Sequence, residues 1–322
     1  METANSVLIT GGGGFIGSKT IEVLLKSEKK PQKIISVDVR EVPIEKKFPG
    51  VEYLIGDIRS QTFFDILKEH SVDTIVHLAS IVTPGKNSNR EFEYSVDVKG
   101  TENVLQASVK AGVEQFIVTS SGAAYGYYED NPHWIKETDE IRGNEEFAYS
   151  HHKRLVEEIL KDYREKYPQL KQLIFRPGTI LGKGVKNQIT DLFEMPFILD
   201  IKDSDSRFVI IWDEDVANCI LKGIQERKSG IYNLAGSGTL NMKQIADILN
   251  KPYIVIPADF LRGILYWLKL FNLSQYGPEQ VKFLQYRPVL ANNKLIEEFG
   301  YTPQKTTEEV FNFYLKEKGI HK

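Results

Sequence analysis

The chain has 322 residues, 41% of them hydrophobic, which is enough to bury a full globular core. Lys and Arg number 41 against 44 Asp and Glu, a balance that does not indicate binding to nucleic acid or an anionic membrane. The first ten residues lack a secretory signal, and no apolar run approaches the ~18 residues that cross a bilayer. Cys219 is the only cysteine, which excludes an internal disulfide and predicts a buried thiol. We therefore expect a cytoplasmic protein that acts on a small molecule, with no nucleic-acid or membrane partner.

Short β-branched runs alternate with amphipathic helices through the first half of the chain. The runs are too apolar for one face to be wet, which predicts a parallel sheet covered by helices on both sides. Repeated βα units of this kind predict a doubly wound α/β fold of the Rossmann type. The expected strands are 7–10, 34–39, 51–55, 74–78, 116–120 and 173–176, and the expected helices include 18–26, 92–111 and 146–165.

The pattern changes after Arg176-Pro177-Gly178, where strands become shorter and irregular stretches longer. This predicts a dinucleotide-binding domain over residues 1–178 and a smaller substrate-binding lobe over 179–322. A helix is still expected over 213–226 and a strand over 231–234, so parts of 206–236 are expected to complete the sheet. The two lobes should be intertwined.

A glycine-rich turn, residues 10–17, separates the first expected strand from the first helix. Glycines there permit positive φ angles and close approach of a pyrophosphate, while the helix N-terminus offers free N–H groups and a positive dipole end. Gly11, Gly14 and Gly17 have one familiar spacing and Gly12, Gly14 and Gly17 the other, so spacing alone leaves the register open. The turn predicts a dinucleotide site.

Asp38 ends the second expected strand, about twenty residues beyond the glycine turn. A carboxylate there can accept hydrogen bonds from the adenosine ribose and would repel a 2′-phosphate, which favours NAD over NADP. Arg40 weakens this preference slightly, because an arginine can accommodate that phosphate.

Tyr149 and Lys153 lie four residues apart, early in an expected helix, and therefore share one helix face. A free tyrosine has a pKa near ~10. A neighbouring lysine cation and an oxidised nicotinamide ring both favour the phenolate, which brings the tyrosine closer to a working general acid/base.

Further motifs follow the glycine turn in a fixed order along nearly the whole chain. They are Gly56-Asp57-Ile58, His77-Leu78-Ala79-Ser80, Val98-Lys99-Gly100-Thr101, Ser120-Ser121 with Tyr125-Gly126, Tyr149 with Lys153, Arg176-Pro177-Gly178, Asp213-Glu214-Asp215-Val216-Ala217 and Tyr232-Asn233-Leu234-Ala235-Gly236. With these motifs the chain resembles the extended short-chain dehydrogenases/reductases, which include nucleotide-sugar epimerases and dehydratases.

The resemblance implies roles for individual residues. Ser121 would hydrogen-bond the reacting oxygen, Tyr149 would transfer the proton, and Lys153 would also hold the nicotinamide ribose. It further implies a homodimer through the helices at 92–111 and 146–165, and Gly11 as the first glycine of the motif. The cofactor-binding residues implied are Gly11, Gly14, Phe15, Ile16, Gly17, Asp38, Asp57, Ile58, Leu78, Ala79, Ser80, Tyr149, Lys153, Pro177 and Gly178.

Two positions depart from the family pattern. Asp97 stands where the family usually has asparagine, in the network that supports the active-site lysine. Residues 179–182, Thr-Ile-Leu-Gly, lack the asparagine that often contacts the nucleotide diphosphate in sugar-nucleotide members. The second departure lowers the expectation of a nucleotide-sugar substrate.

The sequence thus predicts an NAD-dependent oxidoreductase or isomerase of the epimerase/dehydratase type, with hydride transfer at a substrate hydroxyl or carbonyl carbon. One alternative is a dehydrogenase or reductase of a less polar alcohol or ketone. A second is a redox sensor that binds dinucleotide without catalysis, which the Ser121, Tyr149 and Lys153 set argues against. His151 and His152 are adjacent and have no spaced partners, so we expect no metal site.

Residues 260–271 are unusually apolar for the C-terminal half. They predict a helix buried against the sheet or against a subunit partner. A lid over a substrate with an apolar part is one alternative. A helix lying on a membrane surface is another, which a polar face that is not markedly basic disfavours.

Overall fold

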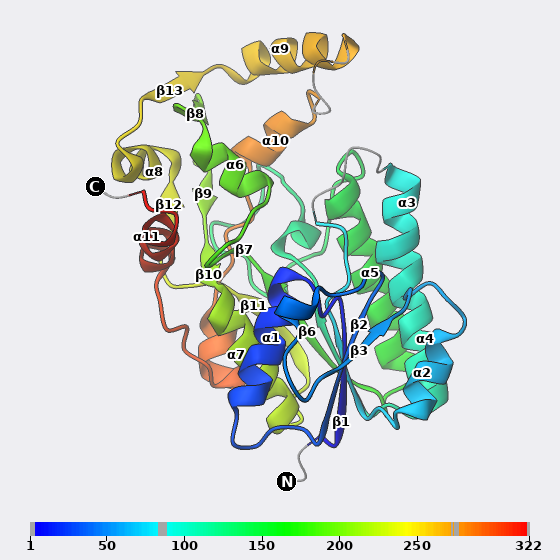
Figure 1. Ribbon diagram of the computed structural model, residues 1–322. Coiled ribbons are helices and arrows are strands. Elements are labelled where there is room, and N and C mark those ends of the chain that lie inside the picture. Colours follow the sequence, from blue (N-terminus) through cyan, green and yellow to red (C-terminus); the bar gives the residue numbers. More distant parts are fainter. Residues whose placement is uncertain (1–3, 83–88, 272, 274–276, 321–322) are drawn as a thin grey trace.

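The computed structural model describes residues 4–82, 89–271, 273 and 277–320. Its centre is a seven-stranded parallel sheet with the strand order β11-β6-β5-β4-β1-β2-β3 (Figure 1). The predicted Rossmann-type fold is therefore confirmed, and so are the six strands expected in the first half. The strands are β1 (Ser6–Thr10), β2 (Lys33–Asp38), β3 (Glu52–Ile55), β4 (Thr74–His77), β5 (Gln115–Thr119), β6 (Lys171–Pro177) and β11 (Gly230–Leu234).

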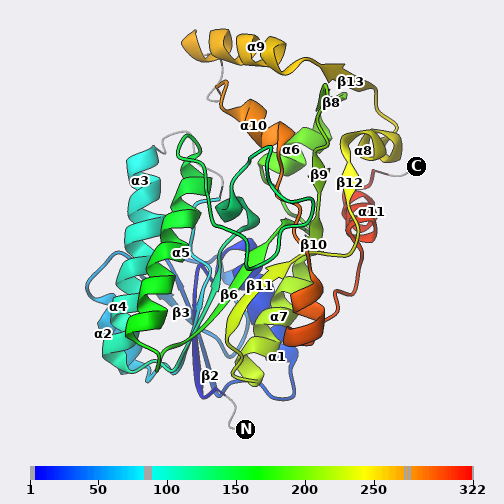
Figure 2. The same cartoon turned by 180° about the vertical axis from the view of Figure 1, so that it is seen from behind.

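Helices cover both faces of this sheet, as Figures 1 and 2 show. On one face lie α1 (Phe15–Lys26) and α7 (Asp213–Gln225), and on the other α2 (Phe63–Glu69), α4 (Thr101–Ala111) and α5 (Ala148–Lys166). Alternate residues of a strand point to opposite faces. Accordingly Val7 and Ile9 of β1 pack with α1 and α7, whereas Leu8 packs with α2, α4 and α5. The predicted burial of Cys219 is confirmed, since it lies on α7 beneath the sheet and burial raises its pKa.

The long helix expected over residues 92–111 is interrupted. It consists of α3 (Arg90–Tyr94), a π-helical turn (Ser95–Gly100) and α4. Such turns are uncommon and occur frequently at functional sites. This one carries Asp97, which it buries beside the end of β4.

The remaining elements form a second region with its own apolar core. Short strands pair here in twos: β10 with β7 and β13 with β8 in parallel, and β12 with β9 antiparallel. The elements are β7 (Thr179–Leu181), α6 (Gln188–Glu194), β8 (Ile198–Ile201), β9 (Arg207–Phe208), β10 (Ile210–Trp212), β12 (Leu240–Asn241), α8 (Met242–Leu249), β13 (Tyr253–Ile256), α9 (Ala258–Leu270), α10 (Gln280–Gln285) and α11 (Thr307–Glu317).

Helix α9 corrects the expectation of burial against the sheet, while burial against a subunit partner stays a prediction. The helix forms where the sequence predicts it, but it does not pack against the sheet. Leu261 is the only buried residue of α9, and it contacts a small cluster that includes Ile201 and Val281. Phe260, Trp267 and Phe271 are 61%, 57% and 65% exposed. The reason is that β8 and α10 cover only one side of α9. In the described part of the chain, no helix is both long enough and apolar enough to span a membrane.

A buried ion pair joins β6 to α5. Arg176 donates from Nε and Nη2 to the two carboxylate oxygens of Glu157, at 2.8 and 2.9 Å, and both side chains are no more than 5% exposed. Its Nη1 donates to the hydroxyl of Tyr125 at 2.8 Å, and that hydroxyl donates to Asn233 of β11 at 2.8 Å. The network therefore connects the sheet, α5 and the turn that follows β5.

We expect Arg176→Met to lower the free energy of unfolding by about 3–5 kcal/mol, because it leaves the carboxylate of Glu157 buried without its cation. Urea denaturation measures this. The double variant Arg176→Met/Glu157→Leu should recover much of the loss, since no buried charge is then left. Asp247→Asn breaks the exposed pair with Lys243 and serves as the control, with a much smaller effect. Equal losses in the control and in Arg176→Met would contradict the prediction.

Candidate active site

The glycine turn between β1 and α1 leaves no room for side chains. Gly11 has a φ of +69°, and a Cβ there would lie 2.9 Å from the backbone nitrogen of Ala79. A Cβ on Gly17 would lie 2.2 Å from the carbonyl oxygen of Gly11, and one on Gly12 would lie 2.2 Å from Ser36 Oγ. Gly11 and Gly17 thus meet backbone atoms and Gly12 a side chain, and the register of the motif stays a prediction.

The N-terminus of α1 is free of side-chain caps. Gly14 is the N-cap residue, no side chain accepts a hydrogen bond from the first turn, and that turn contains no acidic residue. Backbone N–H groups and the positive end of the helix dipole thus face the turn, which suits an anionic pyrophosphate. This cradle fits the pyrophosphate of a dinucleotide.

A cavity of about 560 Å³ extends from the glycine turn to β7, α6 and the segment after α10. Most of the site residues that the sequence predicts lie on its wall. They are Gly11, Gly14, Phe15, Ile16, Gly17, Leu78, Ser80, Ser121, Tyr149, Lys153, Pro177 and Gly178.

Four predicted cofactor residues lie outside this wall. Ala79 lies beneath Gly11, and Asp38 lies beside Gly13, with Oδ2 3.2 Å from where a Cβ on Gly13 would be. Asp57 pairs with Arg59 at 2.6 Å, and this guanidinium lowers the pKa of the carboxyl. Ile58 is buried against Gly100. Their roles toward a cofactor stay predictions.

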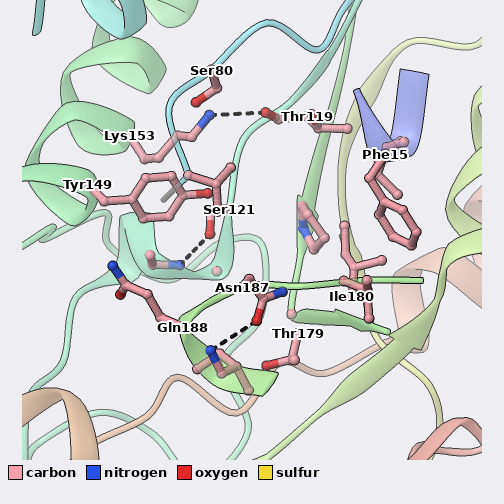
Figure 3. A pocket seen from close by; sticks show the side chains of 18 of the residues that line it. Phe15, Ser80, Thr119, Ser121, Tyr149, Lys153, Thr179, Ile180, Asn187 and Gln188 are labelled. Carbon is pink, nitrogen blue, oxygen red and sulfur yellow. Dashed lines mark hydrogen bonds between the residues drawn. The ribbon is translucent and has the colours of Figure 1, made fainter. Parts of the chain in front are cut away.

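The structure brings Ser121, Tyr149 and Lys153 together on one side of the cavity (Figure 3). Ser121 follows β5, and its Oγ accepts a hydrogen bond from the backbone nitrogen of Ala123 at 3.1 Å. Tyr149 and Lys153 share a face of α5, with Lys153 Nζ 5.6 Å from the centre of the Tyr149 ring. Lys153 Nζ also donates to the carbonyl oxygen of Thr119 at 3.4 Å.

Burial controls the protonation of this group. It raises the pKa of Tyr149 to about 12, an effect that a hydrogen bond with Ser121 opposes and the charge of Asp97 reinforces. Burial lowers the pKa of Lys153, whereas Asp97 and Glu157 raise it. The phenol is thus held neutral in the protein alone. A cation placed beside it would lower its pKa and prepare it for proton transfer.

Asp97, which departs from the family pattern, is fully enclosed behind the catalytic group. Its Oδ1 accepts hydrogen bonds from Ser80 Oγ at 2.9 Å and from the backbone nitrogen of Ile81 at 2.8 Å. Its Oδ2 lies 3.7 Å from Nδ1 of His152, which is also buried. Among the described residues, no group of three or more potential metal ligands occurs.

The end of the cavity away from Tyr149 contains cations that were not predicted from the sequence. Arg287, in the segment after α10, lies between the rings of Phe208 and Phe283, at 4.1 and 4.3 Å from their centres. Neither its Nε nor its Nη2 has a hydrogen-bond partner within the described chain, and burial lowers its pKa to about 10. Lys186 and Arg207 line the same region. No local motif marked these residues, because they come from separate segments of the chain.

Comparison with known proteins agrees with this geometry. The family model described as the NAD dependent epimerase/dehydratase family matches residues 7–235. The UDP-glucose 4-epimerase of Erwinia amylovora is 31% identical over 196 residues, 57% of this chain and 56% of that protein. The structure of the UDP-glucose 4-epimerase of Thermotoga maritima with UDP-glucose is 19% identical, with a TM-score of 0.73, and covers 98% of this chain and 100% of that one. The Bordetella bronchiseptica enzyme WbmG in complex with NAD and UDP is 17% identical, with a TM-score of 0.74, and covers 98% and 94%.

The parallel sheet and its glycine turn define a Rossmann-type dinucleotide-binding enzyme. More particularly, the chain belongs to the NAD dependent epimerase/dehydratase family, whose model matches most of its length. The family is NAD-dependent, so NAD is the cofactor, and the cradle at the N-terminus of α1 fits its pyrophosphate. The predicted family, fold and cofactor are thereby confirmed.

We expect Gly17→Ala to weaken NAD binding. The added Cβ would meet the backbone of Gly11, which cannot move aside without opening the turn. Overpacking of this kind costs about 1–3 kcal/mol, which corresponds to roughly a 10- to 100-fold higher Kd. Titration with NAD measures it. Gly263→Ala is the matched control, because Gly263 also lies in a helix and a Cβ there meets no atom within 4 Å. An unchanged Kd for Gly17→Ala would contradict the role of the turn.

Proposed function

We propose that the protein is an NAD-dependent epimerase acting on a sugar attached to a nucleoside diphosphate. This proposal rests on the different side chains at the two ends of the cavity. One end holds Tyr149 with Ser121 and Lys153, and the other holds the cations Arg287, Lys186 and Arg207. UDP-glucose 4-epimerases are among the relatives of this chain, and UDP or UDP-glucose is bound in the two similar structures.

The catalytic end is suited to reversible proton transfer at one hydroxyl. Bound NAD supplies the acceptor for a hydride from the substrate carbon and the donor for its return. With the positive charges of the cofactor ring and Lys153 beside it, Tyr149 would be present as phenolate, take the hydroxyl proton as the substrate becomes a ketone, and give it back when the alcohol re-forms with inverted configuration. Ser121 donates a hydrogen bond to the reacting oxygen, while Lys153 keeps positive charge beside the phenol. Substrate and product then have the same composition.

The charges on the cavity wall favour epimerisation over dehydration. The charged side chains among the described lining residues are all cations: Lys153, Lys186, Arg207 and Arg287. Elimination of water needs a base for a carbon-bound proton and an acid for the departing hydroxyl, in addition to the group that handles the ketone. Tyr149 supplies one such group, which is sufficient for an epimerase.

The cationic end supports a diphosphate. A guanidinium that contacts aromatic rings instead of carboxylates gains strongly from a phosphate, since charge-assisted hydrogen bonds are about twice as strong as neutral ones. Arg207 is held in place by Asp205 at 2.8 Å, so one cation of the group is already oriented. The lack of an asparagine in residues 179–182 lowers the expectation of a nucleotide-sugar substrate. These cations could contact the diphosphate in place of that asparagine.

Homodimer formation, a cytoplasmic location and the division at residue 178 also stay proposals. Helices α4 and α5, where the family resemblance places the subunit contact, form the outer layer over one face of the sheet (Figure 2). The single buried cysteine suits a reducing compartment.

Activity without added cofactor tests the proposed function. We expect the purified protein to interconvert UDP-glucose or UDP-N-acetylglucosamine and the C4 epimer, and to release about one NAD per chain when denatured. Tyr149→Phe should reduce turnover by about 10²- to 10⁴-fold, the usual contribution of a general acid/base, and should retain its NAD. Tyr163→Phe, on the outer part of the same helix, is the control. An empty site that turns over only with added NAD would instead indicate a dehydrogenase.

Arg287→Met separates a binding role from a structural one. It removes a half-buried cation that no carboxylate of the described chain pairs with, so the free energy of unfolding should stay nearly the same. Binding of UDP should weaken roughly 10- to 100-fold, as expected for the loss of a hydrogen-bonded charge. Calorimetric titration with UDP and urea denaturation measure the two effects. A strong loss of stability like that of Arg176→Met, with unchanged UDP binding, would show that Arg287 is structural.

A further inference from the structure

Exposed apolar side chains are concentrated at one end of the molecule. Of the 19 exposed large hydrophobic residues in the described chain, ten lie between positions 253 and 273. We call these ten residues the α9 face. They are Tyr253, Ile254, Val255, Phe260, Ile264, Tyr266, Trp267, Leu270, Phe271 and Leu273.

The apolar residues occupy about half of the circumference of α9. With about 100° per residue, Phe260, Ile264, Trp267 and Phe271 form one stripe along the helix. Tyr266, Leu270 and Leu273 form a second stripe beside it, extending just past the helix end. The side of α9 that contacts β8 and α10, through Leu261 and Leu265, lies elsewhere on the helix.

The exposed area is large for an isolated surface. The four aromatic side chains of α9 and its end are each more than half exposed, and an aromatic side chain presents about 150–250 Å². These four alone therefore expose on the order of 450 Å², close to the largest patch of a typical monomer at roughly 300–600 Å². The aliphatic residues and β13 enlarge it further.

Two cations border this surface. Arg262 and Lys269 form the polar stripe of α9, and each is paired with a carboxylate, Asp259 and Glu279 respectively, at 2.8 and 2.9 Å. Residues 253–273 contain two basic residues and one acidic residue, whereas the whole chain has a net charge of −3. Long basic side chains at the edge of an apolar face can extend toward lipid headgroups.

The position of α9 leaves the face accessible to a flat surface. Both views show α9 at the extremity of the molecule, beyond α10 and far from the sheet (Figures 1 and 2). No residue of α9 lies on the wall of the cavity. Helix α10 connects the two, because Val281 packs against Leu261 while Phe283 lines the cavity.

We infer that the α9 face binds peripherally to a phospholipid membrane, which differs from the expectation of no membrane partner drawn from the sequence. An amphipathic helix of this kind lies in the plane of the interface with its apolar side among the acyl chains. A helix from a second copy would cover a single stripe, as in a coiled-coil seam. A lipid surface covers both stripes of α9 together. The inference does not depend on the proposed catalytic activity.

Vesicle binding by the full chain tests this inference. We expect the protein to float with vesicles made of equal parts phosphatidylcholine and phosphatidylglycerol, and the emission of Trp267 to shift to shorter wavelength. Phe260→Glu/Trp267→Glu should reduce the bound fraction at least tenfold. Its epimerase activity on a water-soluble substrate should be unchanged, because both residues lie outside the cavity.

Ile44→Glu/Ile55→Glu is the matched control, since these two exposed apolar residues lie outside the α9 face. It should bind vesicles as the unmodified protein does. Failure of the unmodified protein to bind vesicles would overturn the inference. So would equal binding by Phe260→Glu/Trp267→Glu. A smaller oligomer for that variant in size-exclusion chromatography, without vesicle binding by either protein, would assign the face to a second copy.

Discussion

The geometry of the active site depends on the burial of Arg176. A buried guanidinium is stable only when its donors are satisfied, and here Glu157 and Tyr125 satisfy them. Glu157 lies on α5, one turn beyond Lys153, and Tyr125 lies four residues after Ser121. A single charge on β6 therefore fixes the helix that carries Tyr149 and the turn that carries Ser121. The separation between Tyr149 and Ser121 therefore depends on the pairing of Arg176 with Glu157 and Tyr125.

Charge is balanced at one end of the cavity and unbalanced at the other. Lys153 is buried, but Asp97 and Glu157 support its positive charge. Arg287 is half-buried and is in contact with aromatic rings instead of carboxylates. The carboxylates near Lys153 stabilise its charged form in the free protein. Arg287 has no such carboxylate among the described residues, so its site favours the binding of an anion. For the proposed substrate, this contrast would direct the reacting hydroxyl toward Tyr149 and the phosphates toward Arg287.

The sequence predicts those features that depend on local pattern. The strands are recognisable because a parallel sheet buries both faces, as Leu8 and Ile9 illustrate, and the glycine turn is recognisable because Gly11 and Gly17 admit no side chain. Arg287 could not be found in this way, since its environment is made by Phe208, almost eighty residues earlier. Helix α9 shows the opposite limit: apolar spacing predicts an apolar face, but the surrounding fold decides whether anything covers it.

Both ligand-binding regions consist of donors that the folded chain leaves without partners. The first turn of α1 has no capping side chain, and Arg287 has unpartnered nitrogens within the described chain. Groups of this kind cost stability in the free protein, and a ligand that pairs with them returns that cost. Cofactor and substrate should therefore each stabilise the fold, the cofactor through the sheet and the substrate through the segment after α10. Helix α10, which precedes that segment, packs against α9, so the proposed substrate site and the α9 face adjoin the same helix.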